Sequence, residues 1–185
     1  MSTSTSVILG PFDSPATINV SSITIHQDYD HTHSPAQGSN IALLKLSTAI
    51  DFLDDQVPVH PICLGQEGDI PIPGQVVYTG WLGFDRFSLT DNETEMREVV
   101  MDVVSNEQCA LETNLPEDST SMFCARTPFT DNLDDGSGPA VAMLCDGRWV
   151  QVGVSISLPG NSLVVFTKIS SFFTWINDTT SDNTC

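Results

Sequence analysis

Basic residues are scarce in this sequence. Its 185 residues contain 6 lysines and arginines against 24 aspartates and glutamates, so the formal net charge is −18 at pH 7. A charge of this sign and size repels nucleic acids and anionic membranes, and we expect neither as a partner. Basic protein partners are favoured instead.

Long apolar runs are missing as well. No stretch approaches the roughly 18 consecutive apolar residues that a membrane-spanning helix requires. The start, Met1 to Ser6, has neither the basic beginning nor the apolar centre of a secretory signal peptide. The chain is therefore expected to be either cytosolic or the later part of a longer secreted protein.

Zinc-binding motifs are absent too. None of the five cysteines forms a Cys-x-x-Cys pair, and none lies at zinc-ligand spacing from a histidine. His31 and His33 lack an evident third ligand, so we interpret them as part of a solvated loop. We predict no metal and no cofactor. The odd number of cysteines indicates a free thiol or a partner elsewhere.

What the chain does contain is a series of short β-rich segments. They are bounded by Gly, Pro, Asn, Asp or Ser, as strands usually are. The predicted strands cover residues 20–25, 41–46, 76–79, 99–104, 140–144, 150–156 and 163–169. Their regular spacing predicts an all-β protein with an antiparallel barrel or sandwich.

One helix is predicted near the end of the chain, over residues 170–178. Phe172, Trp175 and Ile176 form one apolar stripe, and a serine is available as the N-cap. We expect Trp175, like Trp81 and Trp149, to lie in the core.

Three Asn-x-Ser/Thr sequons are candidates for N-glycosylation. Their asparagines are Asn19, Asn92 and Asn177, and all three lie in polar or loop-like surroundings. The sequons favour an extracellular protein.

Five segments, taken together, resemble the trypsin-like serine proteases of the chymotrypsin fold. They are 25–29 (I-H-Q-D-Y), 40–46 (N-I-A-L-L-K-L), 60–64 (H-P-I-C-L), 78–81 (Y-T-G-W) and 165–176 (V-F-T-K-I-S-S-F-F-T-W-I). They follow the family's order over nearly the whole chain. The resemblance implies two antiparallel β-barrels with the active site between them, a C-terminal helix, and secretion.

The resemblance also implies the domain organisation. Residues 1–185 are expected to form a single domain that lacks the family's N-terminal segment. Residues 7–70 would make a partial first barrel, residues 71–169 the second barrel and residues 170–178 the helix. Because the first strands are missing, we expect an exposed sheet edge.

Two catalytic positions of the family are degraded. Acyl transfer by a serine needs a histidine base, an aspartate that orients it, and two backbone N–H donors for the oxyanion. The family's histidine segment is absent from this sequence, and Asn40 stands at the aspartate position. Asparagine favours the wrong imidazole tautomer, and in a serine protease this change lowers turnover about 10⁴-fold.

The nucleophile motif G-D-S-G-G-P is degraded as well, since residues 134–139 read D-D-G-S-G-P. Aligned from the proline, Gly136 occupies the serine position and Asp135 keeps the motif aspartate. Asp134 then replaces the glycine of the oxyanion hole, where a carboxylate opposes the developing charge. If one glycine is lost instead, Ser137 is the alternative nucleophile.

The cysteines carry further implications of the resemblance. Cys109 and Cys124 match a family disulfide pair, and Cys145 matches a cysteine whose partner position falls near Val76. Cys185 could pair with either Cys63 or Cys145, so the pairing of these three stays open.

Two functions are compatible with this pattern. Asn40 and Gly136 favour a catalytically inactive homologue that acts by binding a protein partner, in an extracellular proteolytic cascade. The alternative is an active serine endopeptidase with Ser137 as its nucleophile and a histidine supplied from an upstream segment. Because Asn40 and Gly136 are substitutions within the chain, we expect no enzymatic activity.

Overall fold

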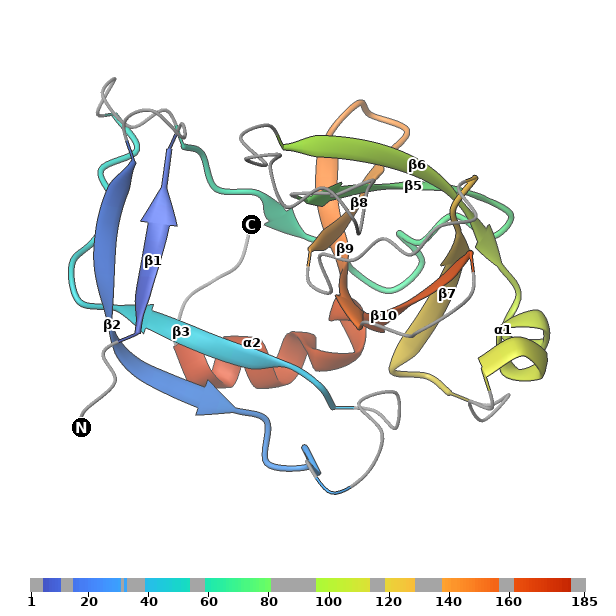
Figure 1. The fold of residues 1–185 in the computed structure, drawn as a ribbon, viewed down its shortest axis with the longest axis horizontal. Coiled ribbons are helices and arrows are strands. Elements are labelled where there is room, and N and C mark those ends of the chain that lie inside the picture. The colour runs from blue at the N-terminus through green and yellow to red at the C-terminus, as the bar shows by residue number, and fades with distance from the viewer. Residues whose placement is uncertain are drawn as a thin grey trace, which may run out of the picture.

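Antiparallel strands dominate the computed structural model, which describes residues 5–10, 15–30, 32, 39–53, 59–80, 96–113, 119–128, 138–156 and 162–180. The strands are β1 (Ser6–Leu9), β2 (Ala16–Ile25), β3 (Ala42–Leu46), β4 (Cys63–Leu64), β5 (Gly74–Gly80), β6 (Arg97–Val104), β7 (Met122–Arg126), β8 (Pro139–Met143), β9 (Trp149–Ile156) and β10 (Leu163–Lys168). The helical segments are α1 (Asn106–Thr113), the 3-10 turn η2 (Ile169–Phe172) and α2 (Phe173–Thr180). Figure 1 shows a three-stranded sheet on one side, a barrel on the other, and α2 running back beneath the sheet.

Six strands close into the barrel. They follow the order β10, β7, β6, β5, β8 and β9, and β10 pairs with β9 as well, which completes the ring. The largest fully buried side chains are Tyr78, Phe166, Met101, Leu163, Val76, Val165, Thr167 and Cys124, all on the barrel strands. The all-β architecture with a C-terminal helix, expected from the resemblance, is therefore confirmed.

Strand β4 belongs to the barrel sheet. It pairs in parallel with β9, with Cys63 opposite Val150. The expected boundary at residue 70 assigns this strand to the first barrel, whereas its backbone hydrogen bonds run to the second.

The remaining strands form a sheet in the order β1-β2-β3. A bulge at Ser21 shifts the register of β2, so that Val20 lies opposite Leu46 while Ile23 lies opposite Leu44. The Ser21 hydroxyl holds the bulge by donating to the carbonyl of Lys45 (2.9 Å). As a result one face of the sheet is wholly apolar, made of Val7, Leu9, Ala16, Ile18, Val20, Ile23, Ile25, Ala42, Leu44 and Leu46.

A cluster of buried side chains joins the sheet to the barrel through the C-terminal helix. Its centre is Ile169, Phe172 and Ile176. The partly buried residues packed on this centre come from both halves of the molecule and are Ile41, Leu43, Leu64, Val154 and Trp175. We call this set the joint cluster. It fixes the position of β3 relative to β9.

His26 reinforces the joint cluster. Its ring lies 5.1 Å from that of Phe172 and 4.9 Å from that of Trp175, and the residue is buried. The Asp28 backbone N–H donates to His26 Nδ1 (3.3 Å), so Nδ1 is the acceptor in this hydrogen bond. The backbone N–H of His26 donates to the carbonyl of Ile41 (3.1 Å). His26 therefore has a structural role in this region.

Helix α1 has no counterpart in the sequence-based prediction, which expects a helix only near the end of the chain. Its only buried residue is Cys109, so it lacks the apolar stripe on which such a prediction depends. Local contacts hold it instead. The Ser105 hydroxyl accepts the backbone N–H of Gln108 (3.3 Å), which caps the helix start.

Two expectations for serine and tryptophan side chains are wrong. No serine caps the C-terminal helix. The Ser170 hydroxyl donates instead to the Glu67 carboxylate (3.2 Å), and the Ser171 hydroxyl donates to the carbonyl of Thr120 (2.6 Å). Trp149 is 47% exposed rather than in the core, since it alternates with the inward-facing Val150 along β9. Trp175 is half-buried in the joint cluster. Trp81 lies outside the described residues.

We expect Gly153→Ala to lower the free energy of unfolding by roughly 1–3 kcal/mol. A Cβ atom at position 153 would lie 2.8 Å from the ring of Phe123 and 3.0 Å from the Cβ of Phe166. Urea denaturation followed by circular dichroism measures the effect. In a Phe123→Leu background the penalty should shrink, because the clashing ring edge is gone. Strictly additive effects of the two substitutions would contradict this explanation.

Candidate functional site

Asn40, which the resemblance assigns to the aspartate position, lies where the sheet meets the barrel. It directly precedes Ile41 of the joint cluster and is half-buried. Its carbonyl oxygen accepts a hydrogen bond from the hydroxyl of Thr167 on β10 (3.0 Å), and Thr167 is 1% exposed. Ser39, just before it, adopts a φ of 54°, and its carbonyl accepts the N–H of Ile41 (2.9 Å). The backbone at residue 40 is therefore tied firmly to the barrel.

The end of the degraded nucleophile motif is tied to the barrel as well. Asp134, Asp135, Gly136 and Ser137 lie outside the described residues, and Gly138 is the first described residue after them. The N–H of Gly138 donates to the hydroxyl of Ser155 (2.8 Å), and the N–H of Ser155 donates to the carbonyl of Gly138 (2.9 Å).

Gly138 has to be a glycine at this position. A Cβ atom there would lie 2.5 Å from the carbonyl oxygen of Thr79 and 2.8 Å from the ring of Tyr78. This crowding gives the last glycine of the motif a packing role that does not depend on catalysis.

The hydrogen bonds that hold Asn40 and Gly138 come from two neighbouring strands. Ser155 of β9 pairs with Phe166 of β10, and Thr167 is the next residue along β10. Asn40 and Gly138 are far apart in the sequence. The two residues that bind them, Thr167 and Ser155, are thus only one position out of register on the paired strands β9 and β10. The structure thus brings Asn40 close to the residue that directly follows the predicted nucleophile segment.

Neither of the two histidines that the structure describes lies where it could act as a general base for this site. The ring of His26 is enclosed by Phe172 and Trp175, as set out above. His60 is exposed, in the segment before β4. His31 and His33 lie outside the described residues. Among the residues that the structure describes, no three histidine, cysteine or acidic side chains could hold a metal ion.

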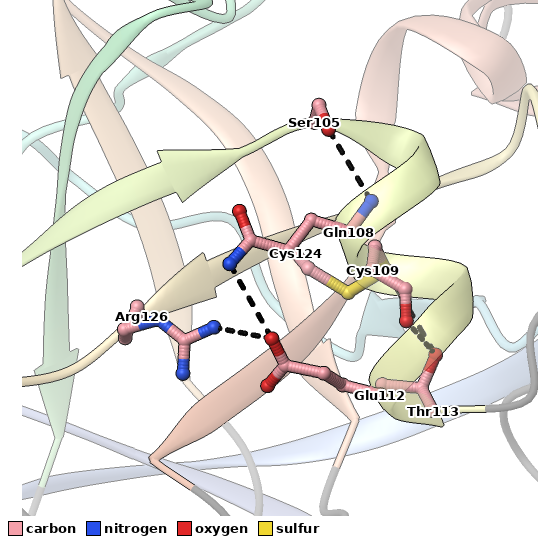
Figure 2. Close-up of a disulfide and its surroundings, with 7 residues drawn as sticks. All are labelled: Ser105, Gln108, Cys109, Glu112, Thr113, Cys124 and Arg126. Carbon is pink, nitrogen blue, oxygen red and sulfur yellow. Dashed lines mark hydrogen bonds and ion pairs between the residues drawn. A yellow bond between two sulfur atoms is a disulfide. The ribbon is translucent and has the colours of Figure 1, made fainter.

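The disulfide between Cys109 and Cys124 is present and attaches α1 to β7 (Figure 2). Beside it, Arg126 of β7 donates from Nη2 to Glu112 of α1 (2.7 Å) and from Nη1 to the hydroxyl of Ser162 (3.2 Å). The hydrogen bond from Arg126 holds the pKa of Glu112 below its ordinary value of 4.5. The covalent bond and the ion pair together hold a helix that has few apolar contacts of its own.

The other three cysteines are Cys63, Cys145 and Cys185, whose pairing the sequence leaves open. Cys63 is disulfide-bonded, with its partner outside the described residues, where Cys185 also lies. Cys145 is a free, exposed thiol in the turn after β8. The resemblance matches Cys145 to a cysteine whose partner position falls near Val76. In the structure Tyr78 of β5 pairs with Ala140 of β8, and Cys145 lies beyond the end of β8.

Two of the three sequons fall on described residues. Asn19 is exposed on β2, whereas Asn177 is half-buried on α2. Asn92 lies outside the described residues. None of the helices in the described ranges has the length and apolar character needed to traverse a bilayer.

We expect Thr167→Val to lower the free energy of unfolding by about 1 kcal/mol. The change keeps the side-chain volume but leaves the carbonyl of Asn40 without its donor. Thermal or urea unfolding measures it, with Thr24→Val, at an exposed strand position, as the matched control. Equal effects of the two changes would show that the hydrogen bond to Asn40 contributes nothing.

The contribution of the Glu112–Arg126 pair should depend on pH. Because the folded pKa of Glu112 is depressed, its stabilising effect is present above 4.5 and disappears as the pH falls through the folded pKa. Glu112→Gln should therefore destabilise the protein more at about pH 7 than at about pH 3. Urea denaturation of both proteins at the two pH values tests this. A difference that does not change with pH would contradict it.

Comparison with known proteins gives one consistent result. The sequence model described as Trypsin matches residues 3–176. Trypsin-1 of Astacus astacus is 29% identical over 170 residues, which cover 88% of this chain and 68% of that protein. Tryptase of Mus musculus is 25% identical over 173 residues, which cover 86% of this chain and 61% of that protein. With its closed barrel, its C-terminal helix and a family match along nearly all its length, the chain belongs to the trypsin family.

Proposed function

We propose that this chain is a non-catalytic member of the trypsin family that acts by binding another protein. The observation that carries the proposal is Asn40. The backbone at this position is held against β10 by Thr167, yet the side chain is an amide. An amide cannot supply the negative charge that stabilises a protonated histidine during acyl transfer. The framework of the site is kept while its charge is lost.

The remaining catalytic groups support the same conclusion. Gly136 stands at the serine position, and Asp134 stands where the family has the oxyanion-hole glycine. The described histidines are used elsewhere, His26 in packing and His60 at the surface. A working site needs nucleophile, base and oxyanion donors together, and the substitutions at the predicted positions 134 and 136 argue against that combination.

An extracellular setting in a proteolytic cascade is part of the proposal. Disulfides such as Cys109–Cys124 persist mainly in oxidising compartments. The exposed Asn19 fits a glycan acceptor on a secreted protein. In such a setting a protease-like fold without proteolytic activity would act through its surface.

The test is labelling with a fluorophosphonate probe, applied to the protein from its natural source with every segment it carries there. We expect no labelled serine, while trypsin in the same buffer reacts. The variant Asn40→Asp should also stay unlabelled, because restoring the carboxylate does not restore a serine at position 136.

The alternative activity has a distinct signature. A serine endopeptidase that uses Ser137, with a histidine from outside this sequence, would be labelled at Ser137. Labelling would be stronger in Asn40→Asp and would be lost in Ser137→Ala. That outcome, mapped by mass spectrometry, would overturn the non-catalytic proposal.

A further inference from the structure

The outer face of the barrel carries an apolar surface across four neighbouring strands. The strands lie in the order β6, β5, β8, β9, and β5 and β6 run side by side along the top of the barrel in Figure 1. Cross-strand partners project from the same face of a sheet. Val100 pairs with Val77, Val77 with Val141, and Met143 with Trp149. These five residues form what we call the barrel patch.

The barrel patch is exposed at both ends. Met143 is 62% exposed, Val100 48% and Trp149 47%, while Val77 and Val141 between them are half-buried. The inward-facing neighbours on these strands, such as Val76, Val99 and Ala142, are at most 3% exposed and already fill the core. The outward residues are therefore not needed to pack the barrel.

Acidic side chains border the barrel patch on β6. Glu98 and Asp102 flank Val100 on the same face and are both exposed. Asp102 accepts a hydrogen bond from the side chain of Gln75 (2.9 Å), but neither carboxylate forms an ion pair with a cation in the described part of the chain. Arg126, directly across from Asp102, gives its guanidinium to Glu112 and Ser162 instead.

We propose that the barrel patch is the docking surface for a basic protein, whose apolar side chains cover Trp149, Met143 and Val100 while its lysines or arginines pair with Glu98 and Asp102. This inference rests on the proposed binding function and names the surface that performs it. An apolar centre with aromatic and methionine side chains inside a polar rim is the usual anatomy of a protein interface.

Charge decides between a basic partner and a second copy of the chain. Two copies would each bring a net charge of −18, so they would repel each other as they approach. Like charges placed across an interface cost several kcal/mol. A basic partner instead gains from the same charges and associates faster because of them.

The experiment uses two libraries of short displayed peptides with the same apolar positions, one flanked by lysine and arginine and the other by glutamate. Each library is selected against the whole protein. We expect binders from the basic library only. Their affinity should fall at least about tenfold in Met143→Lys, because the change places a charge on the most exposed apolar residue of the patch.

Matched variants make the result specific. Leu111→Lys adds the same charge at a residue that is 82% exposed on α1, outside the four patch strands, and should leave binding unchanged. Asp102→Asn should weaken binding mainly at low salt, because it removes a rim charge. Circular dichroism confirms that each variant is folded.

Three results of the peptide selection would overturn the proposal. They are binders from the acidic library in equal number, no binders from the basic one, or binders that tolerate Met143→Lys as well as Leu111→Lys. A dimer that dissociates in Met143→Lys would also overturn it, since a second copy would then cover the barrel patch. Fluorophosphonate labelling tests for catalytic activity and does not depend on the barrel patch. The proposed function and the docking surface can therefore fail independently of each other.

Discussion

The double pairing of β10 is the constraint on which the rest of the structure depends. This strand bonds to β7 on one side and to β9 on the other, and so closes the barrel. Closure leaves no edge among these six strands for another chain to pair with. Val165 and Phe166 of β10 are completely buried in the core.

Because β10 is fixed, its last residues can hold segments that would otherwise be loosely attached. Thr167 holds the backbone at Asn40, and Lys168 forms an ion pair with Glu67 (2.9 Å) in the segment between β4 and β5. The chain then continues directly into η2 and α2, whose apolar residues reach the three-stranded sheet. The relation between the two halves of the molecule is therefore set from one strand.

The contacts that hold Asn40 and Gly138 in place do not involve a catalytic side chain. The anchor at Asn40 uses only its main-chain carbonyl, so replacing a carboxylate by an amide at the side chain does not disturb it. Gly138 is retained by its contacts with Tyr78 and Thr79, whatever stands before it. The main-chain contacts at Asn40 and the packing at Gly138 are therefore compatible with either a carboxylate or an amide side chain at position 40.

Much of the fold could be predicted from local patterns, and the failures have physical causes. Strands such as β6 and β9 are rich in β-branched residues, and their predicted bounds lie within two residues of the observed ones. Strand β7 was missed because Met122 to Ala125 are all buried, which removes the alternation. Asn40 was identified from its motif, but its contact with Thr167 spans 127 positions and leaves no local signal. The outward position of Trp149 depends on the register of β9, which composition alone does not give.

The bulge at Ser21 has a practical consequence for work on this chain. By keeping Val20, Ile23 and Ile25 on one side of β2, it leaves Ile23 and Ile25 about half exposed in the folded state, at 50% and 57%. Dyes that fluoresce on apolar surfaces are commonly used to detect loosely packed, molten states. In this chain the native sheet already offers such a surface, so dye fluorescence should not be taken as a sign of misfolding.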